Sequence, residues 1–244
     1  MMDAGCAVPW PATSAGVPLA AVRVPELLHR QQLLRLSGRG WAQVLEAQWD
    51  ASARRCLTLW AARSLPLVVT RQPQDLAGFI ATGLPAPARM GRRRIALTVA
   101  PADVLFFDEF PEAEQVTRLL PAAAREAWRN LLCRLADADC NARVYGGYGW
   151  QRLTGLAYLH AGSDVDLLLA VRAADCADAV CQALATAAID APRLDGELLL
   201  PDGAAVAWRE WLAWRAGRAS GVLVKRLRGV ALETPDTGVA TESA

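Results

Sequence analysis

The run DVDLLLAV at residues 164–171 constrains the fold more than any other segment. Strongly apolar after its acidic start, it predicts a central strand of a sheet. Asp164 and Asp166 stand two residues apart, so both carboxylates project from the same face of that strand. Two carboxylates forced together repel each other and are costly to bury without a cation. The segment therefore predicts a carboxylate pair that binds Mg²⁺, which prefers one or two carboxylates completed by water and phosphate oxygens.

A pair of glycines precedes this strand. The segment ARVYGG at 142–147 predicts a short strand that ends at Gly146 and Gly147, with a helix beyond them. Backbone N–H groups at such a turn approach a phosphate closely. A plain tight turn, and a solvated Asp beside an N-cap Asp, are the structural alternatives for the two motifs. Together, strand, glycines, helix and Asp-x-Asp favour phosphoryl chemistry.

The remaining pattern predicts an α+β protein with two domains. In the first half we expect a helix over 25–37, a short helix over 41–49, strands over 65–72 and 94–100, and a loop over 82–94. In the second half we expect helices over 121–139 and 174–188, a hairpin around the turn at 201–203, a Trp-rich helix and two strands near 221–232. The predicted domains are 22–111 and 112–235, between a flexible extension (1–21) and a disordered tail (236–244).

Composition excludes several classes of protein. The formal net charge is +1, which argues against a nucleic-acid binder that works by bulk charge. No apolar run approaches the ~18–20 residues of a membrane span. The six cysteines lack metal-ligand spacing, and the N-terminus lacks a basic segment typical of a signal peptide. We therefore expect reduced thiols, no zinc, no membrane partner and a cytoplasmic location.

Several motifs resemble one family. The strand, glycine pair and Asp-x-Asp resemble the nucleotidyltransferase superfamily, although the sixteen residues at 148–163 make the spacing longer than usual there. The segments GWQRLTG (149–155), SDVDLLL (163–169), RLDGE (193–197) and AVAWREW (205–211) resemble the holo-acyl-carrier-protein synthases of malonate decarboxylase, which are phosphoribosyl-dephospho-CoA transferases. The resemblance extends over about 25–230.

This resemblance implies a defined reaction and fold. A phosphoribosyl-dephospho-CoA group would pass from triphosphoribosyl-dephospho-CoA to a serine of the decarboxylase's acyl-carrier subunit, releasing pyrophosphate. A nucleotidyltransferase-type mixed sheet with flanking helices would carry the site, beside a smaller N-terminal α/β domain. One or two Mg²⁺ ions would be held by Asp164, Asp166 and a third carboxylate, which is Asp195 or Glu197.

Within that scheme Asp195 is favoured over Glu197 because its shorter side chain at a strand start resembles the first pair, and it would also accept the serine proton. Glu210 is a weaker candidate. The residues implied to bind substrate are Gly146, Gly147, Trp150, Gln151, Ser163 and Glu197. The family more often has Ser at the position of Gly147, so a hydroxyl contact to phosphate is missing here.

Basic residues form a second, less specific signal. Arg89, Arg92, Arg93 and Arg94 form a cluster that would contact the acidic carrier protein or the triphosphate, or would simply be a solvated loop. Lys225, the single lysine, would meet a phosphate or has no role. We expect His29 and His160 to be structural. The tryptophans at 208, 211 and 214 are expected in the core. Two rival functions remain: another nucleotidyltransferase, and a non-catalytic module that binds the carrier.

Overall fold

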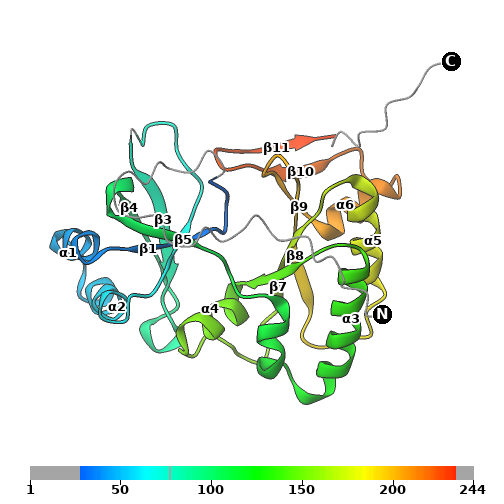
Figure 1. Ribbon diagram of the computed structural model, residues 1–244, viewed down its shortest axis with the longest axis horizontal. Coiled ribbons are helices and arrows are strands. Elements are labelled where there is room, and N and C mark those ends of the chain that lie inside the picture. The colour runs from blue at the N-terminus through cyan, green and yellow to red at the C-terminus, as the bar shows by residue number, and fades with distance from the viewer. Residues whose placement is uncertain (1–27, 77, 235–244) are drawn as a thin grey trace, which may run out of the picture.

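The computed structural model describes residues 28–76 and 78–234, which build two sheets with a buried core beside each (Figure 1). The predicted N-terminal extension (1–21) and the predicted tail (236–244) lie outside the described residues. Helices and strands are mixed in both halves, which confirms the α+β class. Short 3-10 helices occupy Ala88–Met90, Pro101–Asp103, Ala113–Leu119 and Ala122–Ala124.

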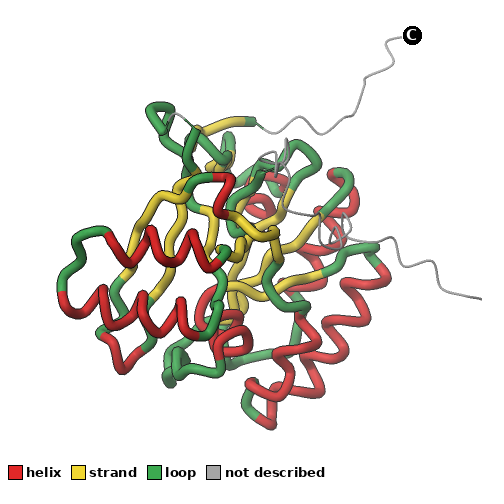
Figure 2. Tube along the Cα trace, turned by 60° about the vertical axis from the view of Figure 1, so that its left-hand side comes forward, coloured by secondary structure: helices red, strands yellow, loops and turns green. Residues whose placement is uncertain are grey.

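The N-terminal sheet is antiparallel throughout, with strand order β4-β3-β2-β1-β5. Its strands are β1 (Leu33–Leu36), β2 (Leu67–Val69), β3 (Ile80–Pro85), β4 (Arg94–Val99) and β5 (Val104–Asp108). Helices α1 (Gly38–Glu46) and α2 (Ala51–Ala62) lie side by side against it (Figure 2). The side chains of Ser37 and Asp50 accept hydrogen bonds from the first free N–H groups of these helices, which fixes where each begins.

Two sequence predictions in this half are wrong. The helix expected over 25–37 contains strand β1 instead, because Leu33 and Leu34 pair with β2 on one side and β5 on the other. Both leucines are completely buried there, and this long-range pairing outweighs the helical spacing of the leucines. The loop expected over 82–94 starts later, since β3 runs to Pro85.

The C-terminal sheet has the order β11-β10-β9-β8-β7-β6, and only the β7–β8 pair is parallel. Its strands are β6 (Ala142–Tyr145), β7 (Val165–Ala170), β8 (Leu194–Leu199), β9 (Ala205–Ala207), β10 (Val222–Lys225) and β11 (Val230–Glu233). Its helices are α3 (Arg125–Asp137), α4 (Gly146–Thr154), α5 (Ala174–Ala185) and α6 (Trp208–Arg215).

The run 164–171 forms β7, which is an inner strand as predicted but lies next to the edge strand β6 rather than at the centre of the sheet. Its residues Val165, Leu167 and Leu169 are completely buried in the core that α3, α5 and α6 cover. Because side chains alternate along a strand, Asp164 and Asp166 project from the opposite face of the sheet. Trp208 and Trp211 are buried in the same core and Trp214 packs against it, as the sequence predicted.

Helix α4 joins the two halves. Trp150 of α4 packs in the N-terminal core between Trp60 and Phe110. Its ring centroid lies 6.4 Å from that of Trp60 and 5.4 Å from that of Phe110. Beyond the helix, the Tyr158 hydroxyl donates a 2.8 Å hydrogen bond to the carbonyl of Pro85. The ring of Trp150 and the hydroxyl of Tyr158 therefore attach the C-terminal half to the N-terminal half.

Candidate active site

The parallel pairing of β7 with β8 creates a cluster of carboxylates on the sheet face away from α3, α5 and α6. Asp166 lies directly opposite Asp195 in the register, and Asp164 precedes β7 by one residue. Glu197 follows two residues after Asp195 and shares its face. The structure thus brings Asp164, Asp166 and Asp195 together, and the electrostatic effect of Asp164 and Asp195 on Asp166 confirms their proximity.

Gly146 lets the backbone come close to Asp166. It begins α4 with φ +59°, a left-handed conformation that glycine adopts without strain. A methyl group at this position would overlap Asp166 Oδ2 and lie 2.7 Å from its Cγ. The turn between β6 and α4 therefore needs glycine for two independent reasons. Gly147 is less constrained, since the nearest atom to an added Cβ is 3.4 Å away.

Asp166 is the most electrostatically perturbed carboxylate of the cluster. Burial, followed by the negative charges of Asp195, Asp164 and Glu197, raises its pKa to about 6. Partial burial alone would raise the pKa of Asp195, but hydrogen bonds from Arg193 and from the Gly196 N–H outweigh it and hold that pKa below its usual range. Neighbouring carboxylates on one sheet face thus have opposite pKa shifts, which is typical of functional sites.

Arg193 is the cation of this cluster, and sequence reasoning missed it. Its Nη2 donates a 2.7 Å hydrogen bond to Asp195 Oδ2, and its Nε lies 3.5 Å from Asp164 Oδ2. The guanidinium therefore bridges two of the three predicted metal ligands. The signal was present in the sequence, because a residue two positions before Asp195 projects from the same face.

The donor set suits a hard divalent cation, since it consists of carboxylate oxygens. Asp166, half-buried beside like charges, has no hydrogen bond or ion pair with another side chain in the described chain. As they stand, however, no three His, Cys, Asp or Glu side chains among the described residues are arranged to hold a metal ion. Arg193 would have to move aside for Mg²⁺ to contact Asp164 and Asp195 together.

Glu197 and Lys225 form their own pair beside this cluster. Lys225 Nζ lies 2.6 Å from Glu197 Oε1, and the Glu197 side chain is only 8% exposed. Its second oxygen, Oε2, is buried without a hydrogen-bond partner. The single lysine, on β10, is thus the partner of Glu197. Glu210, by contrast, lies on α6, where it accepts a hydrogen bond from the N–H of Leu223, and is not brought to the cluster.

The other predicted substrate-binding residues have structural contacts. The Gln151 side-chain oxygen accepts hydrogen bonds from the N–H groups of Tyr158 and Leu159, and Ser163 Oγ accepts one from the N–H of His160. Both therefore fix the loop between α4 and β7. His29, expected to be structural, lies 3.1 Å from Glu109 through Nε2.

A cavity of about 740 Å³ extends from Asp166 to the N-terminal sheet, and we call it the interdomain cleft. Its C-terminal wall contains Asp166 and the Gly146–Gly147 turn. Its N-terminal wall contains residues of β2, β3 and β4 and the segment that follows β3. The lining residues that sequence reasoning did not assign to the site include Arg30, Arg71, Tyr145 and Tyr158, and also His160, which was expected to be structural.

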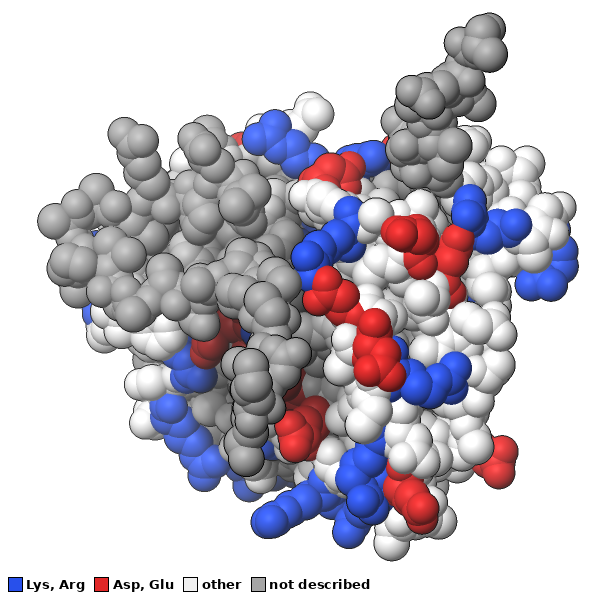
Figure 3. All heavy atoms as spheres, turned by 45° about the vertical axis from the view of Figure 1, so that its right-hand side comes forward, with Lys and Arg blue, Asp and Glu red and all other residues white. Residues whose placement is uncertain are grey.

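The predicted arginine cluster divides at this cleft. Arg92 and Arg94 line it, whereas Arg93 does not. Arg93 instead donates a 2.6 Å hydrogen bond to Asp50, the residue that caps α2. Elsewhere, acidic and basic side chains are interspersed on the surface that the C-terminal half presents in Figure 3, without a patch of one sign.

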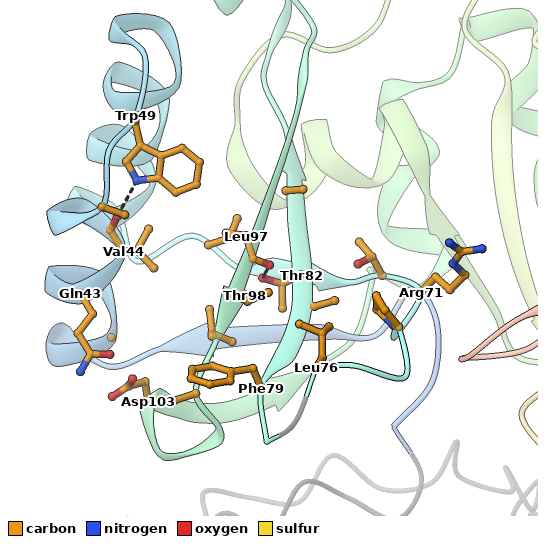
Figure 4. Close-up of a pocket in the computed structure, with 18 residues that line it drawn as sticks. Gln43, Val44, Trp49, Arg71, Leu76, Phe79, Thr82, Leu97, Thr98 and Asp103 are labelled. Atoms are coloured by element: carbon orange, nitrogen blue, oxygen red, sulfur yellow. Dashed lines mark hydrogen bonds between the residues drawn. The ribbon is translucent and has the colours of Figure 1, made fainter.

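A second cavity, of about 650 Å³, lies within the N-terminal half between α1 and the sheet (Figure 4). Its walls are mostly apolar and include the exposed ring of Phe79. Its one acidic residue, Asp103, is already paired with Arg39 at 2.7 Å. The groove therefore offers no cluster of reactive groups comparable to the interdomain cleft.

Comparison with known proteins identifies the family. Residues 111–236 match the model for the C-terminal domain of the phosphoribosyl-dephospho-CoA transferase MdcG, and residues 29–110 match the model for its N-terminal domain. No solved structure matches the chain. Among the described residues, no helix is long and apolar enough to cross a membrane.

Curated relatives agree with the family models. A phosphoribosyl-dephospho-CoA transferase of Bradyrhizobium diazoefficiens is 36% identical over 208 residues, covering 83% of this chain and 88% of that protein. One from Xanthomonas euvesicatoria pv. vesicatoria is 37% identical over 185 residues, covering 74% and 85%. One from Pseudomonas putida (strain W619) is 32% identical over 176 residues, covering 71% and 82%. The chain therefore belongs to the phosphoribosyl-dephospho-CoA transferase family.

Proposed function

We propose that the protein transfers phosphoribosyl-dephospho-CoA from triphosphoribosyl-dephospho-CoA to a serine of the acyl-carrier subunit of malonate decarboxylase, releasing pyrophosphate. The serine oxygen attacks the α-phosphorus of the donor, and the bond from that phosphorus to the pyrophosphate breaks. Such a reaction depends mainly on positioning and on neutralising charge. The proposal keeps the nucleotidyltransferase-type chemistry that the Asp-x-Asp strand favours.

One observation carries the proposal: Asp164, Asp166 and Asp195 converge from adjacent parallel strands beside the Gly146 turn, at the end of a cleft of about 740 Å³. In this reading, the N–H groups of the turn hold donor phosphate oxygens. The carboxylates bind Mg²⁺, which would neutralise phosphate charge when present. Arg193, released from Asp164, would then be free to contact the leaving pyrophosphate.

The proposal also includes a cytoplasmic location. The described cysteines, Cys56, Cys133, Cys140, Cys176 and Cys181, all have free thiols. Burial raises the pKa of Cys56 to about 11 and that of Cys140 to about 12, so these two remain protonated thiols at neutral pH. Free thiols of this kind suit a reducing compartment.

The decisive experiment mixes the protein with Mg²⁺, triphosphoribosyl-dephospho-CoA and the acyl-carrier subunit. Mass spectrometry of the carrier should show one added phosphoribosyl-dephospho-CoA group, and EDTA should prevent the addition. An adduct formed only with ATP or CTP would refute the donor and favour the rival nucleotidyltransferase. Binding of the carrier without any adduct, whichever donor is supplied, would favour the rival binding module.

Variants of the carboxylates test the site itself. Asp166→Asn should abolish transfer while the melting temperature does not fall, because the change removes a charge that burial and its neighbours disfavour. Asp164→Asn should also abolish transfer. The matched control is Asp137→Asn, because Asp137 is exposed at the end of α3 behind the sheet. Near wild-type transfer by either site variant would refute the assignment.

A further inference from the structure

Four arginines line the interdomain cleft without any carboxylate partner. Arg30, Arg71, Arg92 and Arg94 are all part of its walls. None of the four side chains forms a hydrogen bond or ion pair with a described residue, whereas the neighbouring Arg93 is held by Asp50. Unpaired guanidinium groups that converge on one cavity create a positive potential there. The cleft is therefore built to receive an anion.

Arg30 gives the strongest sign of a missing ligand. Its Nε is buried and has no hydrogen-bond partner in the described structure. A desolvated donor on a charged group is costly unless an acceptor occupies the site. Arg30 also acts electrostatically on Tyr145, whose register partner on β7 is Asp166. This arginine therefore lies at the end of the cleft where the carboxylates are.

The floor of the cleft is made by small side chains of the N-terminal sheet. Gly83 of β3 pairs with Ala96 of β4, and both line the cleft. An added Cβ on Gly83 would come within 3.0 Å of the carbonyl oxygen of Ile95, so the floor has no room for bulk at that point. Arg71 lines both the interdomain cleft and the second cavity, where Figure 4 labels it. This part of the cleft wall is therefore formed by small side chains, and Arg94 stands two residues before Ala96 on the same strand.

The shape of the cleft favours a small molecule over a protein surface. Its volume of about 740 Å³ lies in the range of ligand pockets, roughly 300–1,000 Å³. A carrier protein would need about 800 Å² of accessible surface on each partner. Asp166 in the C-terminal wall would repel a polyphosphate, and the arginines of the N-terminal wall offset that repulsion. Of the two proposed substrates, the carrier protein and the nucleotide donor, the nucleotide donor fits the size and charge of the cleft.

We infer that the N-terminal wall of the interdomain cleft is the donor subsite: Arg30, Arg71, Arg92 and Arg94 bind the polyphosphate, and the Gly83–Ala96 floor holds the nucleotide. This inference rests on the proposed function for the identity of the donor. The N-terminal half therefore selects the donor, while the carboxylates of the C-terminal half act on it. The acyl carrier approaches from outside the cleft.

The test measures donor binding by calorimetry in the absence of the acceptor, so that no transfer occurs. Each lost arginine should weaken binding about tenfold, as expected for a hydrogen bond to a charged group, so Arg92→Ala with Arg94→Ala should raise the Kd about 100-fold. The control is Arg93→Ala, which removes the same charge from the same loop outside the cleft. Melting temperatures confirm that each variant is folded.

A second pair of variants tests the floor. Ala96→Trp should weaken binding of triphosphoribosyl-dephospho-CoA but leave binding of inorganic tripolyphosphate within about twofold, since it fills the nucleotide space and keeps the charges. Leu105→Trp is the control, because Leu105 is exposed on β5 at the opposite edge of the same sheet. Equal loss of both ligands, or of neither, would overturn the floor assignment.

The inference and the proposed function fail in different ways. Wild-type transfer together with an unchanged donor Kd in the double arginine variant would overturn the inference and leave the function standing. A raised KM for the carrier with an unchanged donor Kd would assign the arginines to the carrier instead, which also overturns it. Tripolyphosphate binding that depends on Arg92 and Arg94, without transfer by the wild type, would support an anion subsite and refute the function.

Discussion

Replacing Gly146 with alanine should separate positioning of Asp166 from general stability. The left-handed φ of +59° costs an alanine about 1–2 kcal/mol, which lowers the melting temperature of a chain of this size by roughly 2–8 °C. The new methyl carbon would also lie 2.7 Å from Asp166 Cγ. Carbon atoms pack at roughly 3.5–4.0 Å, so this carboxylate must retreat by about 1 Å.

That displacement should appear in catalysis. Misplacing a catalytic group by about 1 Å costs on the order of 100-fold, so transfer to the carrier should fall by about that factor. The control is Gly155→Ala at the end of the same helix, where φ is +69° and no atom lies within 4 Å of the added Cβ. Its melting temperature should fall by a similar amount while transfer is retained. Equal transfer by the two variants, measured by mass spectrometry of the carrier, would refute a positional role for Asp166.

Three further predictions concern stability. Burial has the largest single effect on His29 and lowers its pKa, but the hydrogen bond to Glu109, the negative charge of Glu109 and the hydrogen bond to the Arg30 carbonyl together outweigh burial and hold that pKa above its usual value. The stabilisation from the His29–Glu109 pair should therefore be complete below pH ~6.5 and be lost as pH rises through the folded-state pKa. His29→Gln should remove that dependence in urea titrations. Lys225→Met should cost about 2–3 kcal/mol in the free energy of unfolding, because buried Glu197 loses its partner. Adding Glu197→Gln to that variant should recover part of the lost stability, and no recovery would contradict the pairing. Trp150→Ala should cost about 3–5 kcal/mol by leaving a cavity between Trp60 and its neighbours, and a calorimetric loss below 1 kcal/mol would show that the ring is not part of that core.

Strong local patterns predicted the C-terminal sheet well. The alternation in β7 placed Asp164 and Asp166 on one face, and the turn at 201–203 predicted the β8–β9 hairpin, because both signals are contained within a few residues. The resemblance to the transferase family, carried by short motifs, is confirmed by the family models. Long-range features were harder. Strand β1 depends on partners more than thirty residues away, which no local period reveals.

The site was predicted in part for the same reason. Asp195 was expected on a neighbouring strand, and the parallel register places it beside Asp166. Arg193 was missed although it stands two residues before its partner Asp195, and only the pairing of β7 with β8 shows that it also reaches Asp164. Trp150 was expected near substrate from family resemblance alone; it is one of the residues that line the interdomain cleft, although it is only 4% exposed because its ring packs into the N-terminal core. Burial against a distant part of the chain cannot be deduced from a tryptophan's local sequence.

The placement of Trp150 has a mechanical consequence. Gly146, which approaches Asp166, and Trp150, which is embedded in the opposite core, are separated by about one turn of the same rigid helix. A movement of one half relative to the other would therefore also displace the Gly146–Gly147 turn from Asp166. The position of the N-terminal half and the alignment of the turn with Asp166 are thus linked. A lone C-terminal fragment would leave Trp150 and Leu156 facing water. The two family domains meet near residue 110, but the N-terminal core continues past that junction and includes Trp150 and Leu156.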